Sequence, residues 1–492
     1  MTRLAFPLLT LTVLLPGLVG LAIRWVHSEK TARRLGIGGA VLTLLLAGLS
    51  AWRVLHLSGG GRLVGPLDLA WLGVARPLFG LDGLGAVLLP FFALLSVLVL
   101  VAGPRAKLDP LATSAILLLE STMLGMVETL DLGVLALFFA FQVMVMLAEL
   151  KRREGAGGRE SLVPACSMYL GASVLLLFVG VAWIGRLGAH AGLVAPLHLP
   201  ELAQHGLPVG EARWALGLLL CAVLLREGVF PVHSWLPALL ERGPLGLGLL
   251  FTAAQSGTCI LMRVVLPVFD RPEQGPRALV IVAYLALLTA GYAALVGLVQ
   301  RDLRRVLAFL GLGQSALILV GLDSHSVEET VGGLVTWLAS GLALTGLGLC
   351  TWAVEARVGR PDLHHFHGLA ERTPVLAAFY LVLGLAVVGL PGTLDFVSED
   401  LIVEGVLPSH PILGVVLIVA AALNAILVLR SFSYTFLGPP SARRTTRDLL
   451  VRERLALAVL AITLVGTGLL PRTVLVSRLL SIQGTTAQES VH

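Results

Sequence analysis

Residues 225–263 read L-R-E-G-V-F-P-V-H-S-W-L-P-A-L-L-E-R-G-P-L-G-L-G-L-L-F-T-A-A-Q-S-G-T-C-I-L-M-R. An apolar segment here carries the adjacent pair Arg226 and Glu227 and is interrupted at Pro231, and a second apolar segment contains Gln255. A charged side chain at the centre of a bilayer costs about 2.5–3.5 kcal/mol on insertion scales. Irregular backbone at that depth is tolerated only where protein or water satisfies its polar groups. The stretch therefore predicts a functional site within a membrane.

The whole chain has the composition of a membrane protein. Of its 492 residues, 57% are hydrophobic and only 13% are charged, whereas soluble proteins average about 25% charged residues. Apolar segments of roughly 20 residues recur from end to end, which is the length that a helix needs to cross about 30 Å of hydrocarbon. We predict an all-α, polytopic membrane protein, and the composition excludes a water-soluble globular protein.

Charge and cysteine usage exclude several other classes. The net charge of +5 does not indicate nucleic-acid binding, because the basic residues lie in short loops between apolar segments. Cys166, Cys221, Cys259 and Cys350 are far apart and lie inside apolar segments, so we interpret them as small buried side chains. The sequence shows no haem, iron–sulfur or zinc motif, and we expect no cofactor and no metal.

The apolar segments predict about fourteen transmembrane helices in one membrane domain, residues 1–492. They lie near residues 4–25, 35–57, 78–103, 110–129, 131–150, 163–187, 212–232, 245–267, 277–299, 303–322, 330–355, 374–403, 411–436 and 454–474. The Gly/Pro-rich stretches near 58–77 and 188–211 are predicted surface loops. We divide the domain into three N-terminal helices (1–109), a first five-helix repeat (110–267), a second five-helix repeat (277–436), and a C-terminal helix with its tail (437–492).

Two interrupted helices support the division into repeats. The seventh segment breaks at Pro231, and five segments later the twelfth breaks at Pro391 and continues into Asp395, Glu399, Asp400 and Glu404. Broken helices at corresponding positions of two halves are typical of inverted-repeat transporters with a site near the bilayer midplane. Because the corresponding helices are five segments apart, the two halves would have opposite topology.

Lysine and arginine predict the orientation. Most of them fall in the loops on one side, which include residues 24–34, 105–107, 151–159, 301–305 and 443–454. The side rich in Lys and Arg is normally the cytoplasmic one. We predict that both termini lie outside and that the membrane is the inner (cell) membrane of a bacterium.

A set of polar residues within the apolar segments predicts a hydrated path through the bundle. Its members are Glu120, Gln142, Arg226, Glu227, His233, Gln255, Gln314, Glu399 and Asp400, with Glu404 and Arg430 nearer the segment ends. The alternative is that such side chains reach the interface from helix ends. We favour the path for residues beside a helix break and the interface for Arg430. For His233 the sequence leaves open a proton shuttle, a helix cap or an interfacial loop.

These motifs resemble a known family. F-P-V-H-S-W-L-P at 230–237, followed by L-L-x-x-A-x-x-x-G-x-x-x-L-M-R at 249–263, is similar to the signature of the antiporter-like membrane subunits of NADH:quinone oxidoreductase (complex I), related membrane hydrogenases and Mrp antiporters. Residues 302–314, 367–376 and 389–400 resemble further conserved segments of the same family. The resemblance covers about residues 120–440 and implies a fourteen-helix fold with a proton path along the membrane midplane.

The resemblance also marks positions at which this chain departs from the family. The family's glutamate in the fifth helix, lysines in the seventh and eighth, and histidine in the tenth are matched by Gln142, Arg226, Gln255 and Gln314. No residue near 336–340 ionises where the family has a lysine or histidine in the eleventh helix. Glu399, with Asp400 beside it, matches the titratable residue of the twelfth helix.

Each replacement has a chemical consequence. Buried lysine can release its proton, whereas arginine stays protonated at any relevant pH. Glutamine forms hydrogen bonds and holds water but stores no proton. We therefore expect Arg226 to act as a fixed countercharge to Glu227 or Glu120, and we expect the glutamines to line the path.

The leading hypothesis is a non-redox membrane subunit of a complex I-like or Mrp-like assembly that conducts or couples the translocation of protons or cations. The resemblance implies other membrane and peripheral subunits as partners, within a lipid bilayer. One alternative is the membrane subunit of a dissolved inorganic carbon uptake complex that pairs with a soluble zinc protein. Another is a structural scaffold with a degenerate proton path.

Overall fold

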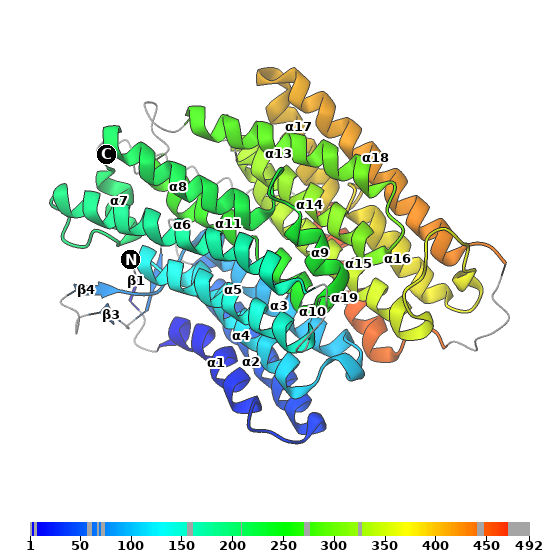
Figure 1. The fold of residues 1–492 in the computed structure, drawn as a ribbon. Helices are drawn as coiled ribbons and strands as arrows, with labels where there is room; N and C mark the ends of the chain where they lie inside the picture. Colours follow the sequence, from blue (N-terminus) through cyan, green and yellow to red (C-terminus); the bar gives the residue numbers. More distant parts are fainter. Residues whose placement is uncertain are drawn as a thin grey trace.

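The computed structural model describes residues 2–3, 7–56, 62–65, 68–69, 74–154, 161–207, 209–269, 276–322, 327–439 and 447–470. Long helices make up most of this part of the chain (Figure 1). Parts of the predicted loop at 58–77 and the tail beyond residue 470 lie outside the described residues.

The described part of the first half of the chain forms seven long helices, the two short helices α7 and α9, and the broken eighth segment. Their bounds are α1 (Leu8–Ile23), α2 (Glu29–Leu55), α3 (Gly83–Ala102), α4 (Pro110–Glu128), α5 (Leu132–Glu154), α6 (Val163–His190), α7 (Leu199–His205), α8 (Val209–Glu227), α9 (Trp235–Arg242), α10 (Leu245–Ala253), α11 (Ser256–Ile260) and α12 (Leu266–Phe269). A π-helical turn at Leu261–Val265 joins α11 to α12.

The second half forms α13 (Pro276–Gly297), α14 (Leu303–Gly321), α15 (Val327–Val358), α16 (Pro374–Ala386), α17 (Leu394–Ser409), α18 (Pro411–Phe436) and α19 (Val451–Leu469). Every predicted apolar segment thus overlaps a helix or a broken run of helices. By length and composition, ten helices among the described residues can cross a membrane, and the apolar helices α1 and α16 are shorter. The total of fourteen spans and the two inverted repeats stay predictions.

The region between α2 and α3 contains short strands that the sequence did not predict. β2 (Leu63–Val64) pairs in parallel with β1 (Thr2–Arg3) and antiparallel with β5 (Gly80–Leu81). β3 (Asp68–Leu69) pairs antiparallel with β4 (Val74–Pro77). Extended backbone satisfies its amides by pairing in this way. The second predicted loop, 188–211, likewise contains the short helix α7.

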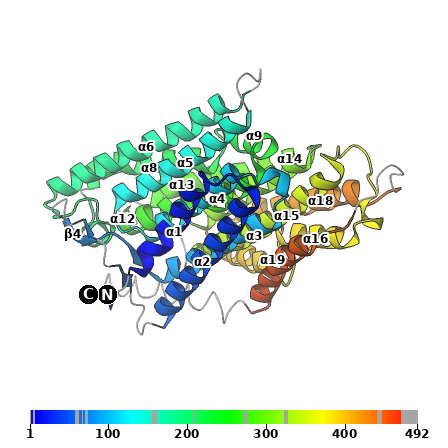
Figure 2. The same ribbon diagram turned by 90° about the horizontal axis from the view of Figure 1, so that it is seen from below.

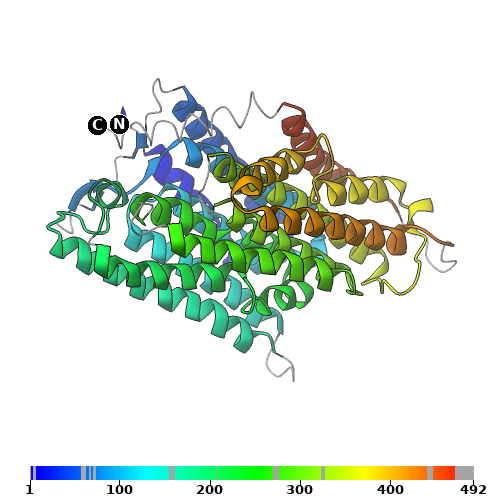
Figure 3. The same ribbon diagram turned by 90° about the horizontal axis from the view of Figure 1, so that it is seen from above.

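Burial separates central helices from peripheral ones. In α14 and α15, 94% of the most apolar window is buried, compared with 33–39% in α2, α6 and α18. The helices α5, α6 and α8 lie on one side of the molecule and α16 and α18 on the other, with α14 and α15 between them (Figures 2 and 3). The exposed side chains of the peripheral helices are largely leucine, isoleucine and valine, as expected of a surface that faces lipid.

One buried ion pair ties the central helices together at the end rich in arginine. Arg304, in the first turn of α14, forms two bonds to Glu355 near the end of α15, with Nε–Oε1 at 2.5 Å and Nη2–Oε2 at 2.6 Å. Its Nη1 donates to the carbonyls of Glu241 and Gly243, at the turn between α9 and α10. The Arg304 and Glu355 side chains are only 8% and 12% exposed. One guanidinium therefore joins four helices.

We expect Arg304→Ala to destabilise the protein by about 3 kcal/mol, the lower end for a broken buried pair, because the Glu355 carboxylate loses both of its short bonds and keeps only a 3.8 Å contact with the more exposed Arg360. The neighbouring variant Arg305→Ala is the matched control. Arg305 pairs with Glu241 while 46% exposed, and such surface pairs contribute at most about 1 kcal/mol. Thermal unfolding in mild detergent, followed by size-exclusion chromatography, compares the two. Equal losses in both variants would contradict the role assigned to the buried pair.

Candidate functional site

Three helix breaks meet near the centre of the bundle and define the candidate site. The first follows α8, where Gly228 has a φ of 70° and the chain turns through Phe230–Pro231 before α9. The second separates α10 from α11 at Gln255, which has a φ of 42°. The third separates α16 from α17, where Gly389 and Gly392 have φ values of 70° and 94°. Each break frees backbone amides and carbonyls that side chains then bind.

The sequence predicted the first and third breaks but not the second. Gly-Pro chemistry signals the other two, whereas the second lies in A-A-Q-S, which contains neither residue. A left-handed backbone conformation at a non-glycine residue is costly and persists only where its surroundings hold it. Here the indole Nε1 of Trp337, on α15, donates to the freed carbonyl of Ala253 at 3.0 Å.

Arg226 is the centre of the first polar cluster. Its Nη2 donates to Gln142 Oε1 on α5 at 3.1 Å, to the Phe251 carbonyl on α10 at 2.9 Å, and to Ser256 Oγ on α11 at 3.2 Å. The guanidinium lies 3.8 Å from the centre of the Phe251 ring, a cation–π contact. The Ser256 hydroxyl also donates to Gln142 Oε1. Neutral oxygen atoms and an aromatic face thus surround this cation.

Glu227 binds a different partner from its neighbour in sequence. Its Oε1 accepts the backbone N–H of Gly257 at 2.6 Å. A side chain at Gly257 would meet that same oxygen at 2.7 Å, so only glycine allows this approach. Arg226 interacts electrostatically with Glu227, which fits the expected countercharge, but no direct ion pair between these two side chains is among the contacts of the described residues. The hydrogen bonds of the two side chains run in different directions, those of Arg226 to α5, α10 and α11 and that of Glu227 to the backbone of Gly257. Consecutive residues of a helix point about 100° apart.

A second cluster links the α10–α11 break to the α16–α17 break. Gln255 Nε2 donates to Ser315 Oγ on α14 at 2.7 Å. The next residue, Gln314, donates from Nε2 to the carbonyl of Val387 at 2.5 Å, just after α16. The Gln314 side chain also interacts with Glu399 on α17. Helix α14 therefore connects two breaks that are more than a hundred residues apart.

We call the connected set the polar chain. It runs from α5 to α17 through Gln142, Arg226, Ser256, Gln255, Ser315, Gln314 and Glu399. Five of these were predicted from the sequence, and Ser256 and Ser315 were not. A serine within an apolar helix usually bonds to its own backbone, so sequence alone does not mark these two as links.

The acidic partner of Glu399 is Asp395 rather than Asp400. Asp395 is completely buried and interacts with Glu399 one turn away on α17. The Glu399 carboxylate lies over Gly389, where a side chain would meet Oε2 at 2.5 Å. Asp400 and Glu404 are exposed. The spacing of four residues between Asp395 and Glu399 is the signal for this pair, because such residues share a helix face.

The remaining predicted residues lie off the polar chain. Glu120 on α4 is fully buried, and neither of its carboxylate oxygens has a hydrogen-bond partner among the described residues. His233 stacks against Phe230 and contacts the edge of Tyr292, with ring centres 5.7 and 4.6 Å away. Arg430 donates to the Gln300 carbonyl at 3.0 Å, close to a helix end, in agreement with the interfacial interpretation.

Glu128, on α4, and Glu149, on α5, are buried glutamates that were not predicted from the sequence. Glu128, near the end of α4, is completely buried and lies within electrostatic range of Arg263. Glu149, on α5, accepts hydrogen bonds from Arg152 Nε at 2.7 Å and Arg153 Nε at 2.6 Å. In the sequence, Glu149 lies within A-E-L-K-R-R (148–153), so that it resembles a residue of the basic loop that follows. Its spacing of seven residues from Gln142 places both on one face of α5.

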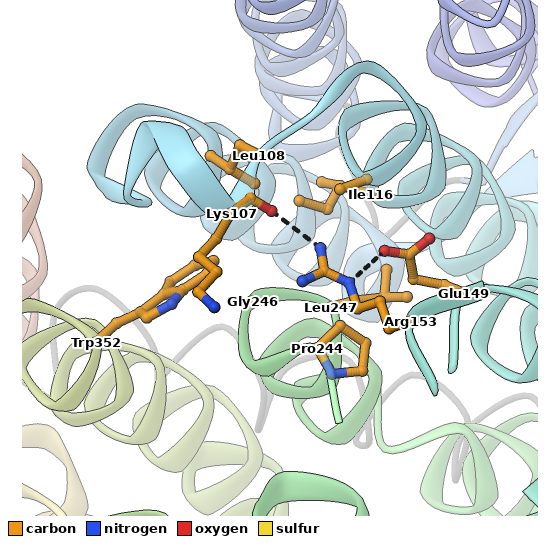
Figure 4. A pocket seen from close by; sticks show the side chains of 10 residues that line it. Lys107, Leu108, Ile116, Glu149, Arg153, Pro244, Gly246, Leu247 and Trp352 are labelled. Atoms are coloured by element: carbon orange, nitrogen blue, oxygen red, sulfur yellow. Dashed lines mark hydrogen bonds and ion pairs between the residues drawn. The ribbon is translucent and has the colours of Figure 1, made fainter. Parts of the chain in front are cut away.

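Glu149 lines a small cavity at the arginine-rich end. The cavity has a volume of about 10 Å³ and lies between α4, α5, α10 and α15, a space for about one water molecule. Figure 4 shows Arg153 between Glu149 and the backbone oxygen of Lys107, with Trp352 and Leu247 on the facing side. Within the described residues, no group of three or more His, Cys, Asp or Glu side chains could hold a metal ion.

Comparison with known proteins agrees with this geometry. The family model described as "NADH:quinone oxidoreductase/Mrp antiporter, TM" matches residues 111–424. NADH-quinone oxidoreductase subunit 13 of Thermus thermophilus is 31% identical over 434 residues, covering 87% of this chain and 88% of the relative. NADH-quinone oxidoreductase subunit M of Rickettsia typhi is 22% identical and covers 96% of this chain and 97% of the relative.

Two solved structures share the fold. A chain of respiratory complex I from Thermus thermophilus with bound NADH superimposes with a TM-score of 0.85 at 28% identity, covering 97% of this chain and 99% of that one. A chain of the Mrp complex from Dietzia sp. DQ12-45-1b has a TM-score of 0.83 at 19% identity, covering 99% and 100%. The polar chain, the broken helices and these matches agree: the protein is an integral membrane protein that belongs to the NADH:quinone oxidoreductase/Mrp antiporter family.

Proposed function

We propose that this protein conducts or couples proton translocation, as a non-redox membrane subunit of a complex I-like or Mrp-like assembly. The observation that carries the proposal is the polar chain, which joins α5 to α17 across three helix breaks. Polar side chains within apolar helices are costly and mark ion or proton pathways. Its relatives are named as subunits of NADH-quinone oxidoreductase, which supports partnership with other membrane and peripheral subunits.

The members of the polar chain have different chemical roles in this proposal. Gln142, Gln255 and Gln314 can donate and accept hydrogen bonds, so they orient water without storing a proton. Arg226 keeps its proton and supplies a fixed positive charge. The groups that can take up and release a proton are the pair Asp395 and Glu399 at the α17 end, and Glu227 beside Arg226.

Two carboxyls on α17, the buried Asp395 and the half-buried Glu399, form the proton-binding station of the proposal. They are one helical turn apart and interact electrostatically. Two negative charges at this spacing repel each other, so the pair favours holding a shared proton. Gln314 connects this pair to the rest of the polar chain through its interaction with Glu399. In this proposal, loss of the proton from Glu399 therefore alters the interaction with Gln314 first.

One observation favours a second function, that of a structural scaffold. The cluster around Arg226 contains neutral acceptors and a cation that does not release its proton. A subunit that has kept the fold and lost conduction would have this arrangement. Proton flux, measured in the intact assembly, separates the two functions.

The first test removes the titratable group of Glu399. We expect Glu399→Gln to reduce proton translocation to background in proteoliposomes containing the assembly purified through this chain, because the isosteric amide cannot bind the proton. Asp400→Asn is the matched control on the same helix, and we expect it to retain translocation because its side chain is exposed. Subunit composition on native gels shows that each assembly is intact. Unchanged translocation in Glu399→Gln would overturn the proposal in favour of the scaffold.

The second test separates a fixed charge from a proton relay at residue 226. Arg226→Leu leaves the Phe251 carbonyl without its donor and removes one of the two donors to Gln142 Oε1, and an unsatisfied buried group costs about 1–3 kcal/mol. We expect a lower melting temperature and loss of translocation. Arg226→Lys keeps the charge, and we expect it to retain most of the translocation. The proposed role of Arg226 is wrong if the lysine variant loses translocation as completely as the leucine variant.

A further inference from the structure

Two arginines from distant parts of the chain meet at the end of α3. Arg33, on α2, donates from Nη2 to the carbonyls of Leu100 and Val101 at 3.2 and 3.0 Å. Arg452, on α19, donates from Nη1 to the carbonyls of Val101 and Gly103 at 3.5 and 3.2 Å. Both guanidinium groups therefore contact the carbonyl oxygen of Val101. They bind the carbonyls that the last turn of a helix leaves free.

A third arginine and an open cavity lie at the same place. Arg105 follows α3 directly and is exposed, and both Arg105 and Arg452 lie close enough to Arg33 to repel its charge. A cavity of about 430 Å³ opens here, lined by Arg105, Leu450, Val451 and Arg452. The Nη1 atom of Arg33 is buried and has no hydrogen-bond partner among the described residues. At least this N–H group of the arginine cluster therefore has no acceptor among the described residues.

The neighbouring acidic groups offset only part of the charge of this cluster. Glu453 attracts Arg452, whereas Arg105 and Arg357 repel it, and Glu453 Oε2 accepts bonds from Arg357 at 2.6 Å and from the backbone N–H of Leu450 at 3.1 Å. Asp448 accepts the backbone N–H groups of Val375 and Leu376. These carboxylates are already engaged, so positive charge is in excess around the cavity.

Apolar side chains continue away from the arginines along α19. Leu455 and Ile462 are 61% and 71% exposed and follow Val451 by four and eleven residues, which places them on the same face of the helix. Figure 2 shows α2 and α19 beside α3, and both pack on it. The surface therefore combines a cationic end with an apolar wall that runs from it along α19. An anionic phospholipid has the complementary arrangement, a negative phosphate at one end and apolar chains that extend from it.

We propose that this crevice, lined by Arg105, Arg452, Leu450 and Val451 with Arg33 behind them, binds the phosphate of an anionic phospholipid. The phosphate oxygens accept from the guanidinium groups of Arg105 and Arg452, because arginine matches phosphate in charge and geometry. The acyl chains lie along the exposed leucine and isoleucine of α19. An acidic protein segment would be matched by the arginines but not by the apolar wall, and basic pockets between transmembrane helices are typical sites for such headgroups.

The test measures lipid-dependent stability and lipid retention. The intact assembly, purified in mild detergent and stripped of lipid, is given phosphatidylglycerol, phosphatidylcholine with the same acyl chains, or inorganic phosphate at equal ionic strength. We expect phosphatidylglycerol alone to raise the melting temperature of this chain and to remain bound in native mass spectra. Arg105→Gln is the decisive variant, because Arg105 makes no hydrogen bond to the described residues and its loss leaves the fold intact. We expect it to weaken the apparent lipid affinity about fivefold.

Arg305→Gln is the matched control, since it removes an exposed arginine from the same end of the molecule without touching the crevice. Arg452→Gln weakens lipid binding too, but it also removes bonds to the end of α3. Equal weakening by Arg105→Gln and Arg305→Gln would show attraction by general surface charge and overturn the site. An equal shift with inorganic phosphate would make it a site for free anions. If phosphatidylglycerol has no effect and a photoreactive residue at position 451 cross-links to another subunit, the crevice holds protein and the proposal fails.

Discussion

The structure depends on how one positive charge is kept inside the bundle. Arg226 lies 2% exposed among apolar helices, and an unpaired cation there would cost several kcal/mol. The chain solves this with neutral acceptors: an amide from α5, a carbonyl at the end of α10, a hydroxyl at the start of α11 and the face of Phe251. The break between α10 and α11 brings the last three within reach, because an unbroken helix would bond its own carbonyls.

That break also connects the two halves of the site. Ser256 faces Arg226 and Gln255 faces Ser315, so adjacent residues on opposite sides of one irregular turn serve two clusters. The price of the left-handed Gln255 is offset by the indole of Trp337 and the hydroxyl of Ser315. Along the polar chain, the group that can release a proton is Glu399, with Asp395 beside it on α17, and Glu227 lies next to Arg226. In the proposed function, proton uptake and release therefore occur beside the breaks, and the amides between them carry hydrogen bonds only.

Arginine has a second role at the end of the bundle where the loops are basic. Arg304 is held by Glu355 and by two carbonyls at a helix turn, and Arg33 and Arg452 are held by the free carbonyls of α3. The first is electrically balanced, whereas the crevice beside α3 keeps excess positive charge. Arg304 therefore needs no further partner, whereas the arginines of the crevice can still bind an external anion.

The sequence by itself determined the class of the protein, the position of nearly every helix and two of the three breaks, because apolar length and proline or glycine act locally. It also identified the family, since F-P-V-H-S-W-L-P and its companions are specific in combination. Only the tertiary structure decided which polar groups meet. The adjacent residues Arg226 and Glu227 bind different groups, Asp395 replaces Asp400 as the partner of Glu399, and Ser256 and Ser315 join clusters that no motif connects. The physical reason is that a hydrogen bond in an apolar interior is set by the geometry of facing helices, which neighbours in sequence do not specify.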